Sequence, residues 1–155
     1  MRPLVALLLL SSVALADSSV PKEGSGSAAT VSLERTACYG RCPIYKVTVL
    51  PDGTVQWEGE RFVKKTGKAT AKLSPATMAQ LADAFKAADF FALRDKYDNR
   101  EMTDQPSAIV RFDDGKRKKS VEHYYGDGSA PKALSVLEER LDALIGTSRW
   151  IGRDK

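Results

Sequence analysis

Two stretches of alternating apolar and polar residues, each interrupted by an Asp-Gly turn, constrain the fold of this chain more than any other feature. The first runs through residues 45–59 and turns at 51–53, and the second runs through 108–125 and turns at 113–115. Side chains along a β-strand point alternately to the two faces of a sheet, so a period of two predicts strands that each bury one face. Short turns rich in Asp and Gly join neighbouring antiparallel strands. The sequence therefore predicts two antiparallel β-hairpins.

The first hairpin supplies an expected part of the core. Val47 and Trp57 fall on its apolar face, whereas Gln56 falls on the other face. A tryptophan beside valines packs into a core more often than it stacks on a ligand, so we expect Trp57 to be buried. We also expect the sheet to continue through residues 62–63 and through a weaker alternating strand at 69–73.

Two further segments have helical periodicity. The first begins at Ser74-Pro75, because a serine side chain can accept from a free backbone amide and proline suits the first helical position. The second begins at 129–131 (Ser-Ala-Pro) and ends at Gly146. Apolar residues share one face in each helix: Met78, Leu81, Ala82, Phe85 and Ala88 in the first, and Leu134, Leu137, Leu141 and Leu144 in the second. Both helices are expected to pack on the sheet, and Trp150 to pack back onto the fold.

The order of these elements predicts the fold class. Strands, a helix, further strands and a second helix follow one another, which is typical of an α+β domain. We expect an antiparallel sheet built from hairpins, with two main helices packed on one face. The polar segment 94–106 contains no apolar periodicity and no calcium-loop spacing, so we interpret it as an exposed loop.

The N-terminal residues indicate export. Residues 1–16 combine a positively charged start, a leucine-rich run and an Ala-Leu-Ala pattern, which is typical of a cleaved signal peptide. The apolar run is shorter than the roughly 20 residues that span a bilayer, so we expect no transmembrane segment after its removal. Residues 17–30 are rich in Ser, Gly and Ala and predict a flexible leader, followed by a single domain over 31–155. We expect a periplasmic or secreted protein, with a monomer favoured.

The only two cysteines, Cys38 and Cys42, lie four positions apart and allow three interpretations. In an exported protein a structural disulfide is favoured, and Gly40 between them permits a tight turn. A redox pair or a copper or zinc site that also uses His123 remains open. The C-x-x-x-C-P segment resembles the copper motif of Sco-type chaperones, in which it leads into a helix. Here Pro43 leads into a predicted strand, so the helix N-terminus that would stabilise a reactive thiolate is missing.

Few other residues suggest chemistry. His123 is the single histidine and shares a strand face with Val121, so a hydrogen-bonded core position is favoured over a ligand. The basic run 116–119 follows two aspartates at a predicted hairpin tip, in a chain whose net charge is +4, so we interpret it as a solvated strand end and expect no nucleic-acid partner. The sequence contains no nucleotide-binding glycine loop, paired-histidine zinc motif or serine elbow, and we expect no cofactor.

The segment around the cysteines resembles a known family. The run from Thr36 to Tyr45 (TACYGRCPIY), the Asp-Gly-Thr-Val turn at 52–55, the His-Tyr-Tyr-Gly run at 123–126 and Trp150 are similar to the pattern of bacterial domain-of-unknown-function family 6438. The similarity covers roughly residues 31–150. It implies an exported bacterial domain and names no activity or catalytic residue.

The functional hypothesis is a non-catalytic binding module of the cell envelope or periplasm, whose unknown partner is an envelope protein or a surface polymer. The candidate binding residues are Tyr39, Arg41, His123 and Tyr124. One alternative is a thiol-redox or metal-handling protein that uses Cys38 and Cys42, with or without His123. A third hypothesis, an envelope hydrolase that uses His123 and a nearby acid, lacks a candidate nucleophile.

Overall fold

The computed structural model describes residues 29–152, so the predicted signal peptide and most of the predicted leader lie outside the described residues. Residues 29–152 form seven strands, two long helices and two short helical segments. Their bounds are β1 Thr30–Arg35, β2 Ile44–Val49, β3 Thr54–Arg61, β4 Gly67–Lys72, α1 Pro75–Ala87, the 3₁₀ helix η1 Phe90–Ala92, β5 Lys96–Tyr97, β6 Ser107–Asp113, β7 Lys118–Tyr124, α2 Lys132–Ile145 and α3 Ser148–Ile151. Across these residues, none of the helices is both long and apolar enough to cross a membrane.

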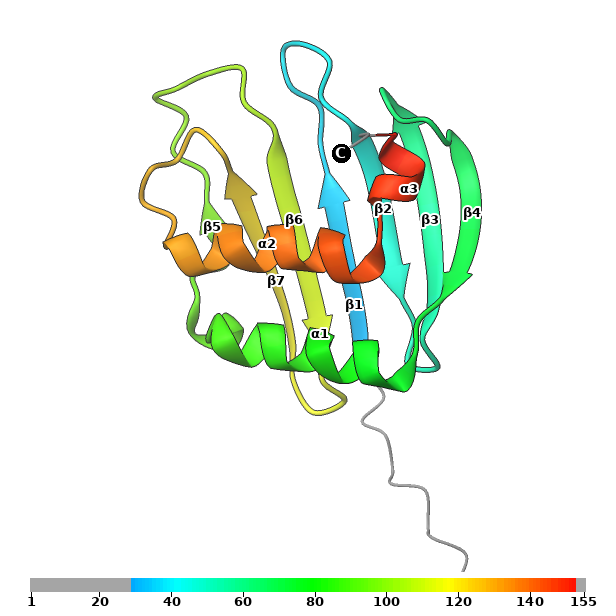
Figure 1. Ribbon diagram of the computed structural model, residues 1–155. Helices are drawn as coiled ribbons and strands as arrows, with labels where there is room; N and C mark the ends of the chain where they lie inside the picture. Colours follow the sequence, from blue (N-terminus) through cyan, green and yellow to red (C-terminus); the bar gives the residue numbers. More distant parts are fainter. Residues whose placement is uncertain (1–28, 153–155) are drawn as a thin grey trace, which may run out of the picture.

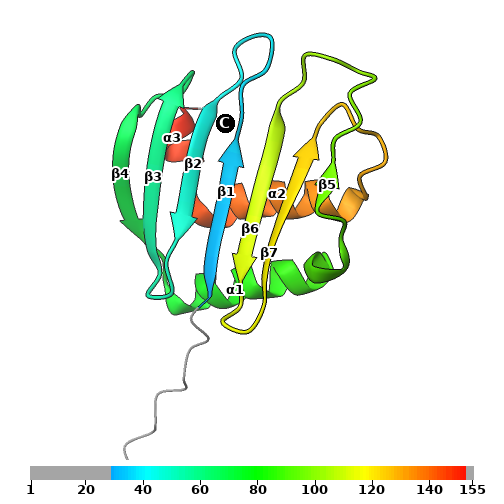
Figure 2. The same ribbon diagram turned by 180° about the vertical axis from the view of Figure 1, so that it is seen from behind.

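All seven strands form one sheet in the order β4-β3-β2-β1-β6-β7-β5. Neighbouring strands are antiparallel except β5, which pairs with β7 in parallel. Figure 1 shows α1 and α2 lying across one face of the sheet, and Figure 2 shows that no helix of residues 29–152 covers the opposite face. The predicted α+β class, with a mostly antiparallel sheet and two main helices on one face, is confirmed.

The arrangement of the strands differs in detail from two adjoining hairpins. Both predicted hairpins are present, as β2–β3 and β6–β7. They do not pair with each other, because β1 lies between β2 and β6 and is antiparallel to both. Sequence reasoning assigned no strand to the residues of β1. β1 is nevertheless the central strand of the sheet, with Val31 and Leu33 buried on the helix side.

Two local predictions are wrong. Residues 62–63 do not extend the sheet, because β3 ends at Arg61 and Phe62 has a φ of 55°, which is incompatible with a strand. The segment 94–106 is not wholly an exposed loop, because it contains β5 and buries Tyr97 to 4% exposure. The polar residues around Tyr97 concealed this short edge strand.

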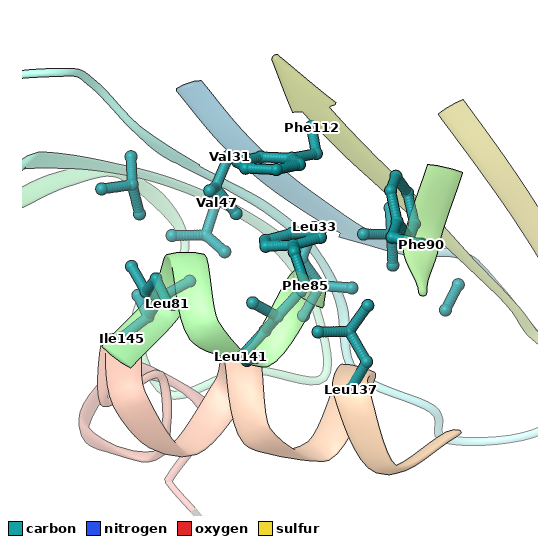
Figure 3. Packing of buried hydrophobic residues seen from close by; sticks show 14 of the residues in the cluster. Val31, Leu33, Val47, Leu81, Phe85, Phe90, Phe112, Leu137, Leu141 and Ile145 are labelled. Atoms are coloured by element: carbon teal, nitrogen blue, oxygen red, sulfur yellow. The ribbon is translucent and has the colours of Figure 1, made fainter. Parts of the chain in front are cut away.

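The core fills the space between the sheet and the two helices (Figure 3). Val47 and Trp57 are fully buried and Gln56 is exposed, so the predicted register of the first hairpin is confirmed. Phe85 of α1 stacks on Phe112 of β6, with ring centroids 4.0 Å apart. Burial of such side chains is worth about 2 to 3 kcal/mol each and accounts for much of the stability of a domain of this size.

The helix boundaries follow the predicted signals closely. The Ser74 side chain accepts a hydrogen bond from the Thr77 backbone amide at the start of α1. Gly146 ends α2 with a φ of 73°, a conformation that glycine adopts without strain. The chain then forms α3, and Trp150 stacks on Trp57 with ring centroids 5.1 Å apart, so it packs back onto the fold as predicted.

Candidate functional site

Four connecting segments gather at one end of the sheet, which we call the loop end: residues 36–43, 62–66, 98–106 and 125–131 (Figure 1). Backbone hydrogen bonds join three of them. The Tyr39 amide donates to the Asp104 carbonyl over 3.1 Å, and the Tyr125 amide donates to the Pro106 carbonyl over 3.0 Å. The loop end is therefore a connected surface.

The loop end carries most of the exposed large apolar side chains among the described residues. Tyr39 is 89% exposed, Met102 is 59% exposed, and Phe62 and Tyr125 are each more than a third exposed. The remaining one, Val136, lies on α2. Exposed apolar side chains that gather on one surface are typical of interaction sites.

A disulfide closes the first of these segments. Cys38 and Cys42 are bonded to each other, with Cα atoms 5.8 Å apart, so the structure has the predicted pairing. Gly40 between them has a φ of 153°. Pro43 leads directly into β2, as predicted. The bond holds Tyr39 outward at the tip of the segment, and Arg41 places its guanidinium 5.7 Å from the centre of the Phe62 ring.

A cleft of about 740 Å³ opens beside the disulfide, between α2 and the loop-end portions of β1, β2 and β7. Cys42 and Pro43 form one wall. Most of the other lining residues have polar or charged side chains, chiefly Arg35, Tyr45, His123, Asp127, Glu138, Glu139 and Asp142. Several of these charged side chains are partly or fully buried beneath α2. They need partners, because an unpaired buried charge is strongly unfavourable.

Glu138 is the first centre of a hydrogen-bonded network in this cleft. It lies on the buried face of α2, only 1% exposed. One carboxylate oxygen lies 2.8 Å from Nδ1 of His123, and the other accepts from the Tyr125 hydroxyl over 2.8 Å. The guanidinium of Arg35 lies 3.8 Å from the second oxygen.

Asp142, one turn further along α2, is the second centre. Its carboxylate accepts from Arg35 over 2.8 Å, from the Tyr45 hydroxyl over 2.6 Å and from the Thr147 hydroxyl over 2.7 Å. Arg35 thus joins the two carboxylates. These hydrogen bonds connect helix α2 to strands β1 and β2 at this end of the sheet.

The network shifts two titrations. Burial lowers the pKa of Arg35, but the Asp142 carboxylate and the Tyr45 hydroxyl more than offset this, so the net pKa is raised. Burial is the largest cause of the raised pKa of Tyr45, and the neighbouring Asp142 carboxylate raises it further. Arg35 therefore stays charged and Tyr45 stays a neutral hydrogen-bond donor over the physiological pH range.

The structure separates the candidate residues predicted from the sequence. Tyr39 and Arg41 lie at the surface of the loop end, and His123 lines the cleft. Tyr124 is only 2% exposed; its hydroxyl donates to the Met102 carbonyl and accepts from the Gln105 amide, so it supports the segment 98–106 from beneath. Within residues 29–152, no three side chains of His, Cys, Asp or Glu are grouped so as to hold a metal ion.

Sequence reasoning missed Arg35, Tyr45, Glu138 and Asp142 as site residues. A signal existed for Glu138, since this carboxylate interrupts the apolar face of α2 between Leu137 and Leu141. No such signal existed for the partners of these carboxylates, because the partners lie far away in the chain. Arg35 and Asp142, for example, are 107 positions apart.

The basic run 116–119 is paired with carboxylates. Lys118 lies 2.9 Å from Asp113, and Lys119 lies 2.7 Å from Asp95. This hairpin tip is at the opposite end of the sheet from the loop end (Figure 1). Its charges are thus largely balanced locally.

The family can be assigned once this geometry is known. A family model described as a domain of unknown function (DUF6438) matches residues 29–145. The chain belongs to this family. The match spans β1 to the end of α2 and so includes the disulfide, His123, Glu138 and Asp142. No curated protein matches the chain.

Proposed function

We propose that this protein is an exported, non-catalytic module that binds a component of the bacterial cell envelope or periplasm through its loop end. The observation that carries the proposal is the coincidence of exposed apolar side chains, a disulfide-pinned segment and a charged cleft at one end of the sheet. A rigid segment loses less conformational entropy on binding than a mobile one. The Cys38–Cys42 disulfide, which constrains the segment that carries Tyr39, therefore favours recognition.

Export is part of the same proposal. Residues 1–16 have the pattern of a signal peptide. Disulfides persist in oxidising compartments, which agrees with a periplasmic or secreted location. We further propose a monomer that acts on a separate partner, either an envelope protein or a surface polymer.

Site-specific photocrosslinking in the native host tests this function. A photoreactive phenylalanine analogue at position 39 or 102 should give a discrete crosslinked product. The same analogue at 136 is the matched control, because Val136 is also exposed but lies on α2 away from the loop end. Products of equal yield from all three positions, or none from 39 and 102, would contradict the proposal.

The position of Cys42 in the cleft wall favours a second candidate, thiol-redox exchange by Cys38 and Cys42. In that reaction a partner thiolate attacks one sulfur, the other leaves as a thiolate, and the partner becomes transiently disulfide-bonded to the domain. The metal-handling version would require reduced cysteines, with or without His123, whose Nδ1 lies against Glu138. Alkylation rates of the reduced protein across pH separate these roles. Fast alkylation near neutral pH supports exchange, and ordinary thiol rates support a structural bond.

A further inference from the structure

The cleft carries a strong excess of negative charge for a protein of positive net charge. Four carboxylates line it, those of Asp127, Glu138, Glu139 and Asp142, against the single guanidinium of Arg35. The chain as a whole has a net charge of +4. A cleft lined mainly by one sign of charge focuses its field and draws in ligands of the opposite sign.

Arg35 does not cancel this field. Its guanidinium is held by Asp142 at 2.8 Å and lies 3.8 Å from Glu138, so it is shared between two carboxylates. Glu139 is exposed at the cleft wall and has no ion pair among residues 29–152. Asp127 accepts from the backbone amides of Asn99 and Ser129 and is attracted by the Arg94 guanidinium. Glu139 is thus the cleft carboxylate that has no cationic partner among residues 29–152.

An independent observation is the outer nitrogen of His123. The ring is 5% exposed, and its Nδ1 faces the Glu138 carboxylate, which can only accept. Nδ1 therefore carries a proton, and in the neutral form of the ring Nε2 presents a lone pair. Nε2 has no partner among the described residues. The His123 side chain is part of the lining of the cleft.

These acceptors define the chemistry of a ligand. The geometry points to a primary ammonium group, from a lysine side chain of the partner or from a free diamine, bound by His123 Nε2 and the Glu139 carboxylate. An ammonium group has three donors and no acceptor, which matches an imidazole lone pair beside carboxylates. An anionic ligand would meet four carboxylates. This inference rests on the proposed function, since it names the group that the binding surface receives.

The single histidine makes the test direct. In the isotope-labelled protein, the ring ¹⁵N signals of His123 report the neutral Nδ1–H form and any hydrogen bond accepted by Nε2. Titration at pH 8 and low salt with cadaverine, and separately with a lysine-containing peptide, should shift the Nε2 signal to saturation. Added salt should weaken both titrations. A response to cadaverine alone assigns the site to free amines, and a response to the peptide alone assigns it to a partner side chain.

Matched variants locate the binding group. Glu139→Gln should weaken binding about tenfold, because the negative charge of the acceptor is lost while the exposed position leaves folding intact. Asp83→Asn makes the same charge change on α1, outside the cleft, and should leave affinity unchanged. The Nε-acetylated lysine peptide should not bind.

Two results would overturn the inference. One is no movement of the His123 signals at about 10 mM of either amine, a concentration that detects even millimolar affinity. The other is an equal response to the acetylated peptide or to a neutral sugar, which would indicate a ligand without a cation. Either result leaves the crosslinking test of the loop end unaffected, so the two proposals fail separately.

Discussion

The two halves of the space between sheet and helices are filled in different ways. Near α1 the filling is aromatic, with Phe85 stacked on Phe112 and Phe90 set edge-on against Phe85 at 5.0 Å. At the loop end, below α2, a network of carboxylates, a guanidinium and an imidazole lies beside the stacked rings of Tyr45, Trp57 and Trp150. Helix α2 belongs to both, since Leu137 and Leu141 point into the core (Figure 3) and Glu138 and Asp142 serve the network.

The contrast distinguishes packing for stability from packing for recognition. Apolar burial stabilises a fold in proportion to area, whereas a buried ion-pair network roughly balances its desolvation cost. The same helix could therefore bury apolar residues throughout with no loss of stability. That it does not do so at the loop end supports a role for the charged half in binding.

The largest effect should come from the apolar half. Phe85→Ala removes a ring that is 2% exposed and contacts two other aromatic rings, so the free energy of unfolding should fall by about 4 kcal/mol. Urea denaturation followed by fluorescence measures this change. Val136→Ala, at a half-exposed position, is the control and should cost little. Similar losses in the two variants would mean that the aromatic cluster does not dominate the core.

The charged half should respond differently to single and paired changes. Glu138→Leu leaves His123 Nδ1 without its acceptor and should destabilise the domain by about 3 kcal/mol. The pair Glu138→Leu with His123→Phe removes both polar groups and should recover much of that loss. A double-mutant cycle in urea measures the coupling energy. If the double variant is as unstable as Glu138→Leu alone, the charged pair contributes net stability and the contrast between the halves fails.

The disulfide should have a moderate effect. Cys38→Ser with Cys42→Ser opens a ring closed over only four positions, which costs about 2 kcal/mol in the loop-closure model. The domain should still fold, with the β2–β3 hairpin retaining its amide protection in hydrogen exchange. Loss of protection throughout the sheet would show that the bond is needed for the fold itself.

The smallest effect concerns acid. The pKa of Asp127 is lowered to about 2, chiefly by hydrogen bonds from Ser129 and from the Asn99 backbone amide. Because the folded-state pKa lies below the ordinary value, this stabilisation is present above about pH 4 and disappears as the pH falls towards 2. The stability difference between the native protein and Asp127→Asn should shrink over that window. A difference that is constant with pH would show that the carboxylate charge contributes nothing.

The predictable parts of the fold were those with local periodicity. The β2–β3 hairpin, α1 and α2 each repeat a pattern over several residues, so their buried faces were assigned correctly. Strand β1 has only Val31 and Leu33 as alternating apolar residues, and its central place depends on pairing with strands far along the chain. Strand β5 has two residues and no pattern at all.

The site was predictable to a smaller extent. Proximity in sequence and an inferred oxidising compartment were enough to predict the pairing of Cys38 with Cys42. His123 was recognised as a hydrogen-bonded buried residue, but its partner was not, because Glu138 approaches it from a different element. Contacts between a strand and a distant helix have no signature in a single sequence except a charge misplaced on an apolar face.

The strand order also affects how the protein behaves at high concentration. The outermost strands are β4, a short run with Lys68 and Lys72 in exposed positions, and β5, which offers only two residues for pairing. A free strand edge invites a neighbouring molecule to extend the sheet, and lysines or extreme shortness discourage it. Crowded copies would therefore gain little by pairing the edge strands of their sheets.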